Sequence, residues 1–200
     1  MKRRYRWCLS CDLVSVHPDD IVSQASEAAR YLEHDNGFHQ SGYVEMLTRL
    51  LDRTVVPRIP LGGSLLDYGC GYAPVLVELA RRRGYDAAGW DPYFLSNPKA
   101  LARRYHALIA CEVVEHAAQP VALFEQVVSL LQPNGVFAVR SSLHPARWDA
   151  FLDFWYTWDR THVSFYSERT VRYCADRFGF TVDHLQNPIW VLRRRAEGEA

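Results

Sequence analysis

The feature that most constrains the fold is a short apolar segment that leads directly into a glycine-rich turn. The run Ser64-Leu65-Leu66-Asp67-Tyr68 suits a buried strand, and Gly69-Cys70-Gly71 turns the chain. Residues 75–83 then have the apolar spacing of a helix, and Gly84 is placed to end it. A glycine turn between a strand and a helix lets the backbone approach a ligand and points free helix N–H groups at it. The segment therefore predicts a nucleotide site in an α/β fold.

The spacing of the glycines decides which nucleotide is expected. The dinucleotide fingerprint needs glycine at the first, third and sixth positions of the turn, which hold Gly69, Gly71 and Pro74 here. The proline argues against a nicotinamide or flavin enzyme. The run 67–71 instead resembles the first motif of the class I S-adenosylmethionine-dependent methyltransferases, although Ala73 stands where that family usually has a third glycine. An ordinary tight turn is the alternative.

A second acid fits the same resemblance. Residues 85–90 are expected to form the next strand, and Asp91 follows them. In doubly wound folds an acid about 20 residues beyond the glycine turn accepts hydrogen bonds from ribose hydroxyls. An acid that merely begins the turn at Pro92 is the alternative. The resemblance implies a cofactor site made of Asp67, Tyr68, Gly69, Cys70, Gly71, Asp91, Pro92, Cys111 and Glu112.

The remaining segments continue the α/β pattern. Residues 105–111 and 136–139 predict strands, with a helix at 120–131 and a turn at Pro133-Asn134-Gly135 between them, in an order similar to the fourth and fifth strands of the family. Residues 93–104 are too few for a full crossover. A later helix, which carries Val171, Cys174, Ala175 and Phe178, is expected to begin after a cap at Ser167 and to end at Gly179. We expect a Rossmann-like doubly wound, mostly parallel sheet with helices on both faces, one shortened crossover and an N-terminal helical lid.

The chain is expected to hold one main core, because 200 residues suit a single domain. The predicted parts are an extension at 1–20, a helical lid at 21–60, the methyltransferase domain at 61–195 and a disordered tail at 196–200. In the lid, Asp19 or Asp20 is expected to cap the first helix. His34 and Asn36 are either cofactor contacts or local caps of their own helix end.

The extension carries a Cys-x-x-Cys pair at Cys8 and Cys11. The pair resembles the second knuckle of the zinc ribbons that precede some methyltransferase domains. A closed zinc site needs four ligands, no second pair is present, and only His17 lies nearby, so the sequence favours a remnant over a zinc site. The odd total of five cysteines fits reduced thiols.

The charges limit the expected partners and location. The chain has 23 basic and 23 acidic residues and a pI of about 7.1, which gives no reason to expect binding to nucleic acid or to an anionic membrane. No apolar run has the length of a transmembrane helix, and no signal peptide is recognisable. We expect a cytoplasmic protein with a small-molecule substrate; the oligomeric state stays open.

A cluster of acids and histidines supplies the candidate chemistry. Glu112, Glu115 and His116 have the spacing of one face of a helical turn. Similar clusters in some small-molecule O-methyltransferases and RNA 2′-O-methyltransferases, joined by a distant histidine, hold a divalent metal. The resemblance implies metal ligands at Glu112, Glu115, His116 and His162 and catalytic roles for His116, Glu115 and His162. A metal-free general base at His116, or a pair that only closes a turn, are the alternatives.

The predicted function is in-line methyl transfer from S-adenosylmethionine to a small acceptor, a reaction that depends mainly on alignment. The aromatic residues of the stretch 151–158 are expected to cover that acceptor. A methyltransferase acting on nucleic acid or protein is an alternative that lacks a basic stripe. A non-catalytic cofactor-binding module is another, for which Ala73 and the shortened crossover are the arguments.

Overall fold

A six-stranded sheet forms the centre of the computed structural model, which describes residues 3–33, 36–196 and 198. Its strands are β3 (Ser64–Tyr68), β4 (Asp86–Trp90), β5 (Tyr105–Cys111), β6 (Leu131–Arg140), β8 (Phe180–Gln186) and β9 (Ile189–Arg194). They lie in the order β4-β3-β5-β6-β9-β8. Strands β3 to β6 are parallel, whereas β9 is antiparallel to β6 and to β8.

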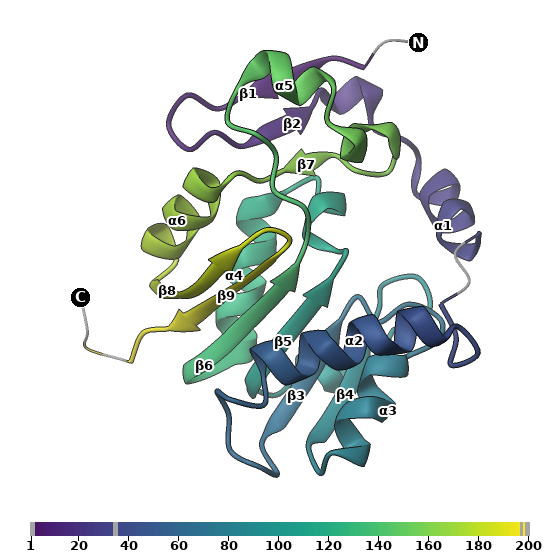
Figure 1. Ribbon diagram of the computed structural model, residues 1–200, viewed down its shortest axis with the longest axis vertical. Coiled ribbons are helices and arrows are strands. Elements are labelled where there is room, and N and C mark those ends of the chain that lie inside the picture. Colours follow the sequence, from purple (N-terminus) through teal and green to yellow (C-terminus); the bar gives the residue numbers. More distant parts are fainter. Residues whose placement is uncertain (1–2, 34–35, 197, 199–200) are drawn as a thin grey trace.

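Helices cover both faces of this sheet (Figure 1), because alternate side chains of its inner strands point to opposite sides and both sets are apolar. On β5, Leu108 faces a core shared with α4 (Pro120–Leu130) and α6 (Glu168–Arg177). Ile109 faces a second core shared with α2 (Ser41–Thr54) and α3 (Val75–Arg82). The predicted doubly wound fold is confirmed.

The crossover between β4 and β5 is short, as predicted. The segment holds one 3-10 helix (Pro98–Leu101) and an isolated bridge between Asp91 and Leu95. A parallel crossover through a full helix takes a dozen residues or more, so no further strand fits beside β4. Strand β4 is consequently the edge of the sheet.

Two predicted helix ends are confirmed. Gly84 follows α3 with φ of +84°, and Ser167 caps α6 in a reciprocal arrangement with Thr170. The predicted caps Asp19 and Asp20 are wrong. Helix α1 (Gln24–Leu32) begins after Ser23, whose side chain accepts a hydrogen bond from the backbone N–H of Ser26.

Asp19 and Asp20 lie instead in a separate 3-10 helix (Pro18–Asp20), where both carboxylates bind Arg4. The predicted turn at 133–135 falls inside β6, as an irregularity in its pairing with β5 where Asn134 has φ of +62°. A sequence with a strong turn preference is therefore accommodated within β6 as a local irregularity in its pairing with β5.

The first residues form part of a second, three-stranded sheet. Strands β1 (Tyr5–Trp7), β2 (Val14–Val16) and β7 (Ser164–Phe165) lie in the order β1-β2-β7. Their apolar side chains pack with Phe151 of α5 (Trp148–Leu152) and with Tyr156. This small sheet and α5 stand beyond the carboxyl ends of β5 and β6 (Figure 1).

The Cys-x-x-Cys pair lies in the turn between β1 and β2. Cys8 is exposed and Cys11 is buried, and both are free thiols. In the part of the chain that the structure describes, no third histidine, cysteine or acid joins them in a potential ligand group. The interpretation as a zinc-ribbon remnant stays a prediction.

The two helices expected as a lid differ in their surroundings. Helix α1 has no buried residue, whereas Leu47, Leu50 and Leu51 of α2 belong to the main core. Only α1 is therefore free to act as a cover. His34 lies outside the described residues, as does most of the predicted tail. Within the described ranges, no helix has the length and apolar character needed to cross a bilayer.

Candidate active site

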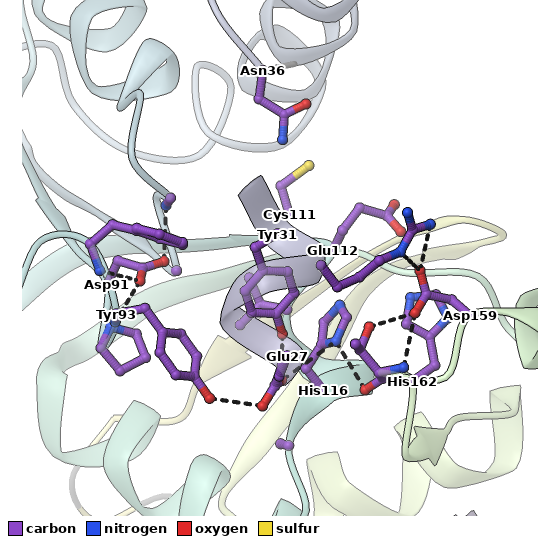
Figure 2. A pocket seen from close by; sticks show the side chains of 18 of the residues that line it. Glu27, Tyr31, Asn36, Asp91, Tyr93, Cys111, Glu112, His116, Asp159 and His162 are labelled. Carbon is purple, nitrogen blue, oxygen red and sulfur yellow. Dashed lines mark hydrogen bonds and ion pairs between the residues drawn. The ribbon is translucent and has the colours of Figure 1, made fainter. Parts of the chain in front are cut away.

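A cavity of about 930 Å³ opens where the carboxyl ends of β3, β4 and β5 meet α1 and the segment after α5. In open α/β sheets this edge is where ligands bind, because loops and helix N-termini converge there. Gly71, Asp91, Tyr31 and His116 line the cavity from four separate segments of the chain. Figure 2 shows Asp91, Tyr31 and His116 around one common space.

The glycine turn forms one wall. Gly69 has φ of +81° and Gly71 has φ of +65°, conformations that L side chains rarely adopt. A Cβ added to Gly69 would meet Val113 Cγ2 at 2.5 Å, whereas a Cβ added to Gly71 would meet no atom within 4 Å. Gly69 thus permits close packing inside the protein, and the open space beside Gly71 is room for a ligand. This turn fits the amino acid part of the predicted cofactor.

Asp91 is fixed beside that turn. Its Oδ2 accepts from the backbone N–H of Gly71 at 3.0 Å, and Oδ1 accepts from those of Tyr93 and Phe94 at 2.8 and 3.0 Å. A carboxylate has about four acceptor positions, so capacity for further donors remains. The rigid, buried acid therefore fits a ligand with hydroxyl groups, such as a ribose.

All but one of the predicted cofactor residues line this cavity: Tyr68, Gly69, Cys70, Gly71, Asp91, Pro92, Cys111 and Glu112. Asp67 does not. Its carboxyl group is buried beneath the turn, and this burial, together with the nearby charge of Asp91, raises its pKa to about 7.

The expected helical face of Glu112, Glu115 and His116 is wrong. Glu112 has φ of +54° and precedes a 3-10 helix (Val114–His116), so its side chain leaves in another direction. The Glu112 carboxylate instead pairs with Arg140 and accepts a hydrogen bond of 2.6 Å from the Tyr156 hydroxyl. Glu112 is consequently not part of the group of potential metal ligands.

That group comprises Glu115, His116 and His162, whose ligand atoms lie within 4.8 Å of one another. His162 Nδ1 donates to the Tyr156 carbonyl at 2.7 Å, and His116 Nδ1 donates to the Thr161 carbonyl at 3.1 Å. These bonds place the proton of each neutral ring on Nδ1. Burial lowers the pKa of His162 and so favours its neutral form.

Glu115 is fully buried behind the cavity wall. Burial and the charge of Glu112 raise its pKa well above the usual range. Its Oε1 contacts the Tyr156 hydroxyl, while Oε2 has no hydrogen-bond partner among the described residues. A phenol has one proton to donate, so Tyr156 serves both Glu112 and Glu115 without conflict when Glu115 is protonated.

Helix α1 brings residues that the sequence analysis missed. Glu27 accepts hydrogen bonds from the hydroxyls of Tyr31 at 2.5 Å and Tyr93 at 2.7 Å, and Arg30 pairs with Asp159 at 3.2 Å (Figure 2). The spacing of Glu27 and Tyr31 by four residues was the available signal, since it places both on one helix face. Their partners come from distant segments and carried no local signal.

The model of the methyltransferase domain family matches residues 37–185, which is most of the chain. This chain belongs to the methyltransferase domain family. The resemblance to S-adenosylmethionine-dependent methyltransferases that the glycine turn indicated is confirmed. No curated protein matches the methyltransferase by sequence.

Solved structures share its fold at low identity. The Burkholderia thailandensis 1,6-didemethyltoxoflavin-N1-methyltransferase, with bound 1,6-didemethyltoxoflavin and S-adenosylhomocysteine, is 11% identical with a TM-score of 0.60, over 98% of this chain and 100% of that one. The Synechocystis PCC 6803 magnesium protoporphyrin IX methyltransferase with bound S-adenosylmethionine is 16% identical with a TM-score of 0.55, over 86% and 92%.

A third structure concerns partners. In a Haloferax volcanii complex, the Trm112 methyltransferase activator is bound to a methyltransferase that is 12% identical to this chain, with a TM-score of 0.53, over 85% of this chain and 96% of that one. At such identities the likeness extends to the fold alone.

Proposed function

We propose that the methyltransferase moves a methyl group from S-adenosylmethionine to a small molecule bound in the cavity between the glycine turn and the His116–His162 pair. One observation carries the proposal: Gly71 and Asp91 are hydrogen-bonded to each other and line the same cavity as both histidines. The solved toxoflavin and porphyrin methyltransferases, which share this fold, act on small molecules and support the same substrate class.

The cofactor would be held by the turn at Gly69 to Gly71 and by Asp91, with Pro92, Cys111 and Glu112 around it. When bound, S-adenosylmethionine supplies an electrophilic methyl group. The contribution of the chain is alignment, because a displacement reaction is accelerated mainly by holding its two reactants in line. Asp91, fixed by three backbone N–H groups, is suited to that task.

His116 is the proposed general base. Its Nδ1 donates to the Thr161 carbonyl, so the basic nitrogen of the neutral ring is Nε2, which would take the proton of an acceptor hydroxyl or amine. His162 lies beside it with ring centroids 4.8 Å apart. Glu115 does not line the cavity, and its role is to position Tyr156, whose carbonyl in turn fixes His162.

A divalent metal at Glu115, His116 and His162 is the second candidate. The unpartnered, buried Glu115 Oε2 and the close approach of the three ligand groups support it. Two imidazoles and one carboxylate suit a first-row transition ion, which would polarise an acceptor oxygen. Metal analysis of the purified protein and turnover with and without a chelator separate the candidates. Turnover that persists in the presence of a chelator would rule out the metal mechanism. Turnover that is lost on chelation and restored by one ion would rule out the metal-free base.

Calorimetric titration with S-adenosylhomocysteine, followed by turnover of S-adenosylmethionine against a panel of small hydroxyl and amine acceptors, tests the proposed function. Binding with turnover is expected. Binding without turnover on any acceptor would favour the non-catalytic module, and methylation confined to nucleic acid or protein would favour the macromolecular alternative. The absence of cofactor binding would contradict all three.

A further inference from the structure

Two of the three tryptophans that line the cavity remain largely exposed to water. The side chain of Trp155 is 57% exposed and that of Trp158 is 78% exposed, and both border the cavity near His162. Burial of a large aromatic side chain stabilises a fold, and these two residues forgo much of that gain. Exposed aromatic groups at the edge of a cavity are typical of a surface that a ligand covers.

The turn that carries them is firmly held. It is a 3-10 helix (Trp155–Trp158), and Tyr156 between the tryptophans is only 2% exposed. Arg3 donates hydrogen bonds to the carbonyls of Thr157 and Asp159 at 3.3 and 3.1 Å. A ligand that met these rings would not have to order the backbone beneath them, which favours affinity.

The charges around the cavity disfavour ligands that carry a negative charge. Among the described residues that line it, four carry carboxyl groups (Glu27, Asp91, Glu112 and Asp159) and one carries a guanidinium, Arg30. Arg30 is already shared by Asp159 at 3.2 Å and Glu33 at 2.6 Å. A carboxylate or phosphate on the acceptor would therefore meet carboxyl groups of its own sign and a guanidinium that is already paired.

Asp159 in particular is held in place. Its Oδ1 accepts hydrogen bonds from the backbone N–H and the hydroxyl of Thr161 at 2.9 and 2.6 Å, and its Oδ2 pairs with Arg30 at 3.2 Å. Its charge stands directly beside Trp158 in the sequence and borders the same cavity.

We infer that the methyl acceptor is a planar aromatic molecule without negative charge, stacked on Trp155 and Trp158 with its nucleophilic heteroatom turned toward His116 and His162. The inference rests on the proposed function and names the substrate class and its specificity residues. Stacked aromatic pairs gain stability beyond the area they bury, so the two indoles select for planarity. The carboxyl groups of the cavity select against anions.

Three probes of similar size separate these properties. β-Naphthol is planar and uncharged at neutral pH, hydroxynaphthoic acid adds a carboxylate to the same rings, and decahydro-β-naphthol is saturated and not planar. Each is titrated by calorimetry into protein saturated with S-adenosylhomocysteine. We expect β-naphthol to bind at least about tenfold more tightly than either of the others.

The variants Trp158→Ala and Trp155→Ala should each weaken β-naphthol binding about tenfold, and Trp158→Phe should restore most of the loss. The matched control is Trp148→Ala, because Trp148 is 46% exposed in the neighbouring helix but does not line the cavity. The affinity for S-adenosylhomocysteine, measured first on every variant, should not change.

Three results would each overturn the inference. They are undetectable binding of β-naphthol to the protein saturated with S-adenosylhomocysteine, tighter binding of the carboxylate probe than of β-naphthol, and unchanged β-naphthol affinity in both tryptophan variants. Failure of the wild-type protein to bind S-adenosylhomocysteine would instead contradict the proposed function. The two failures are thus distinguished by the first titration.

Discussion

The backbone N–H of Gly71 donates to Asp91 Oδ2 at 3.0 Å, and this bond joins the turn after β3 to the end of β4. The two residues follow adjacent parallel strands, β3 and β4, that pair in register up to Tyr68 and Trp90. Because both strands end at the same edge, the turn and the acid form one side of the cavity. The bond gives the proposed cofactor site a fixed geometry before any ligand arrives.

Replacing this acid should disable cofactor binding. Asp91→Ala leaves three backbone N–H groups without their acceptor and removes the proposed partner of the ribose, so S-adenosylhomocysteine affinity should fall about 10- to 100-fold, as measured by calorimetry. Asp86→Ala is the control, since Asp86 lies at the exposed start of the same strand and pairs with Arg103. Equal affinity in the two variants would contradict the assignment.

The two glycines of the turn should respond differently to alanine. In Gly69→Ala the new methyl meets Val113 and the φ of +81° is strained, so the free energy of unfolding should fall at least about 1 kcal/mol more than in Gly71→Ala. Gly71→Ala should keep more stability but lose S-adenosylhomocysteine affinity, because its methyl enters the open cradle. Urea unfolding and calorimetry check both. The reverse order of stabilities would be inconsistent with this packing.

Tyr156→Phe should destabilise the fold. The phenol donates to Glu112 and contacts the buried Glu115, and its loss leaves the Glu115 carboxyl group without that partner, at a cost of about 1 to 3 kcal/mol in the free energy of unfolding. Tyr173→Phe on α6 removes a half-exposed hydroxyl and should change little. Thermal and urea unfolding of the pair measure the difference, and equal stability would show that the shared hydroxyl contributes nothing.

Asp67 should make the fold less stable as the pH rises. Its pKa is raised from the ordinary 3.8 to about 7, so between these values the folded state keeps a proton that the unfolded state has lost. The free energy of unfolding therefore falls from about pH 4 to pH 7, by on the order of 4 kcal/mol in total. Asp67→Asn, which cannot ionise, should flatten this slope and be the more stable protein at pH 8. Urea unfolding of both proteins at pH 5 and pH 8 measures this. The same loss of unfolding free energy in Asp67→Asn as in the wild type would contradict the prediction.

Helix α1 should open without global unfolding, because it buries no residue and is held by polar contacts such as Arg30 with Asp159. Arg30→Ala should speed hydrogen exchange in residues 24–32 and leave the melting temperature almost unchanged. Arg49→Ala, which removes a surface ion pair with Glu45 on α2, is the control and should leave exchange in α1 unaltered. Faster exchange in both variants would indicate a general loosening.

The strand, turn and helix around Gly71 were predictable because short-range chemistry determines them. Glycine supplies the positive φ, apolar alternation supplies the buried strand, and the distance to Asp91 follows from one β-α-β unit. The same local logic located α6 and its cap at Ser167. Elements of this kind can be predicted from sequence wherever the local preferences of the residues agree with the overall fold.

The acceptor side was harder to predict, because it is assembled from contacts between distant segments. Glu112 takes a left-handed backbone conformation that a helical spacing does not reveal, and it is held by Tyr156 and Arg140. Glu27 meets Tyr93, from a loop after β4, through a single hydrogen bond. The site residues proposed from the sequence therefore remain predictions for the experiments above.

The pairing of β2 with β7, in which Val14 lies opposite Phe165, has a consequence for the way the protein is made. A ribosome delivers the chain from its first residue, so the opening hairpin waits for about 150 further residues before its partner strand emerges. The cofactor half draws on neighbours close along the chain and can condense earlier. The wall that faces the proposed acceptor is thus completed only after β7 has been translated.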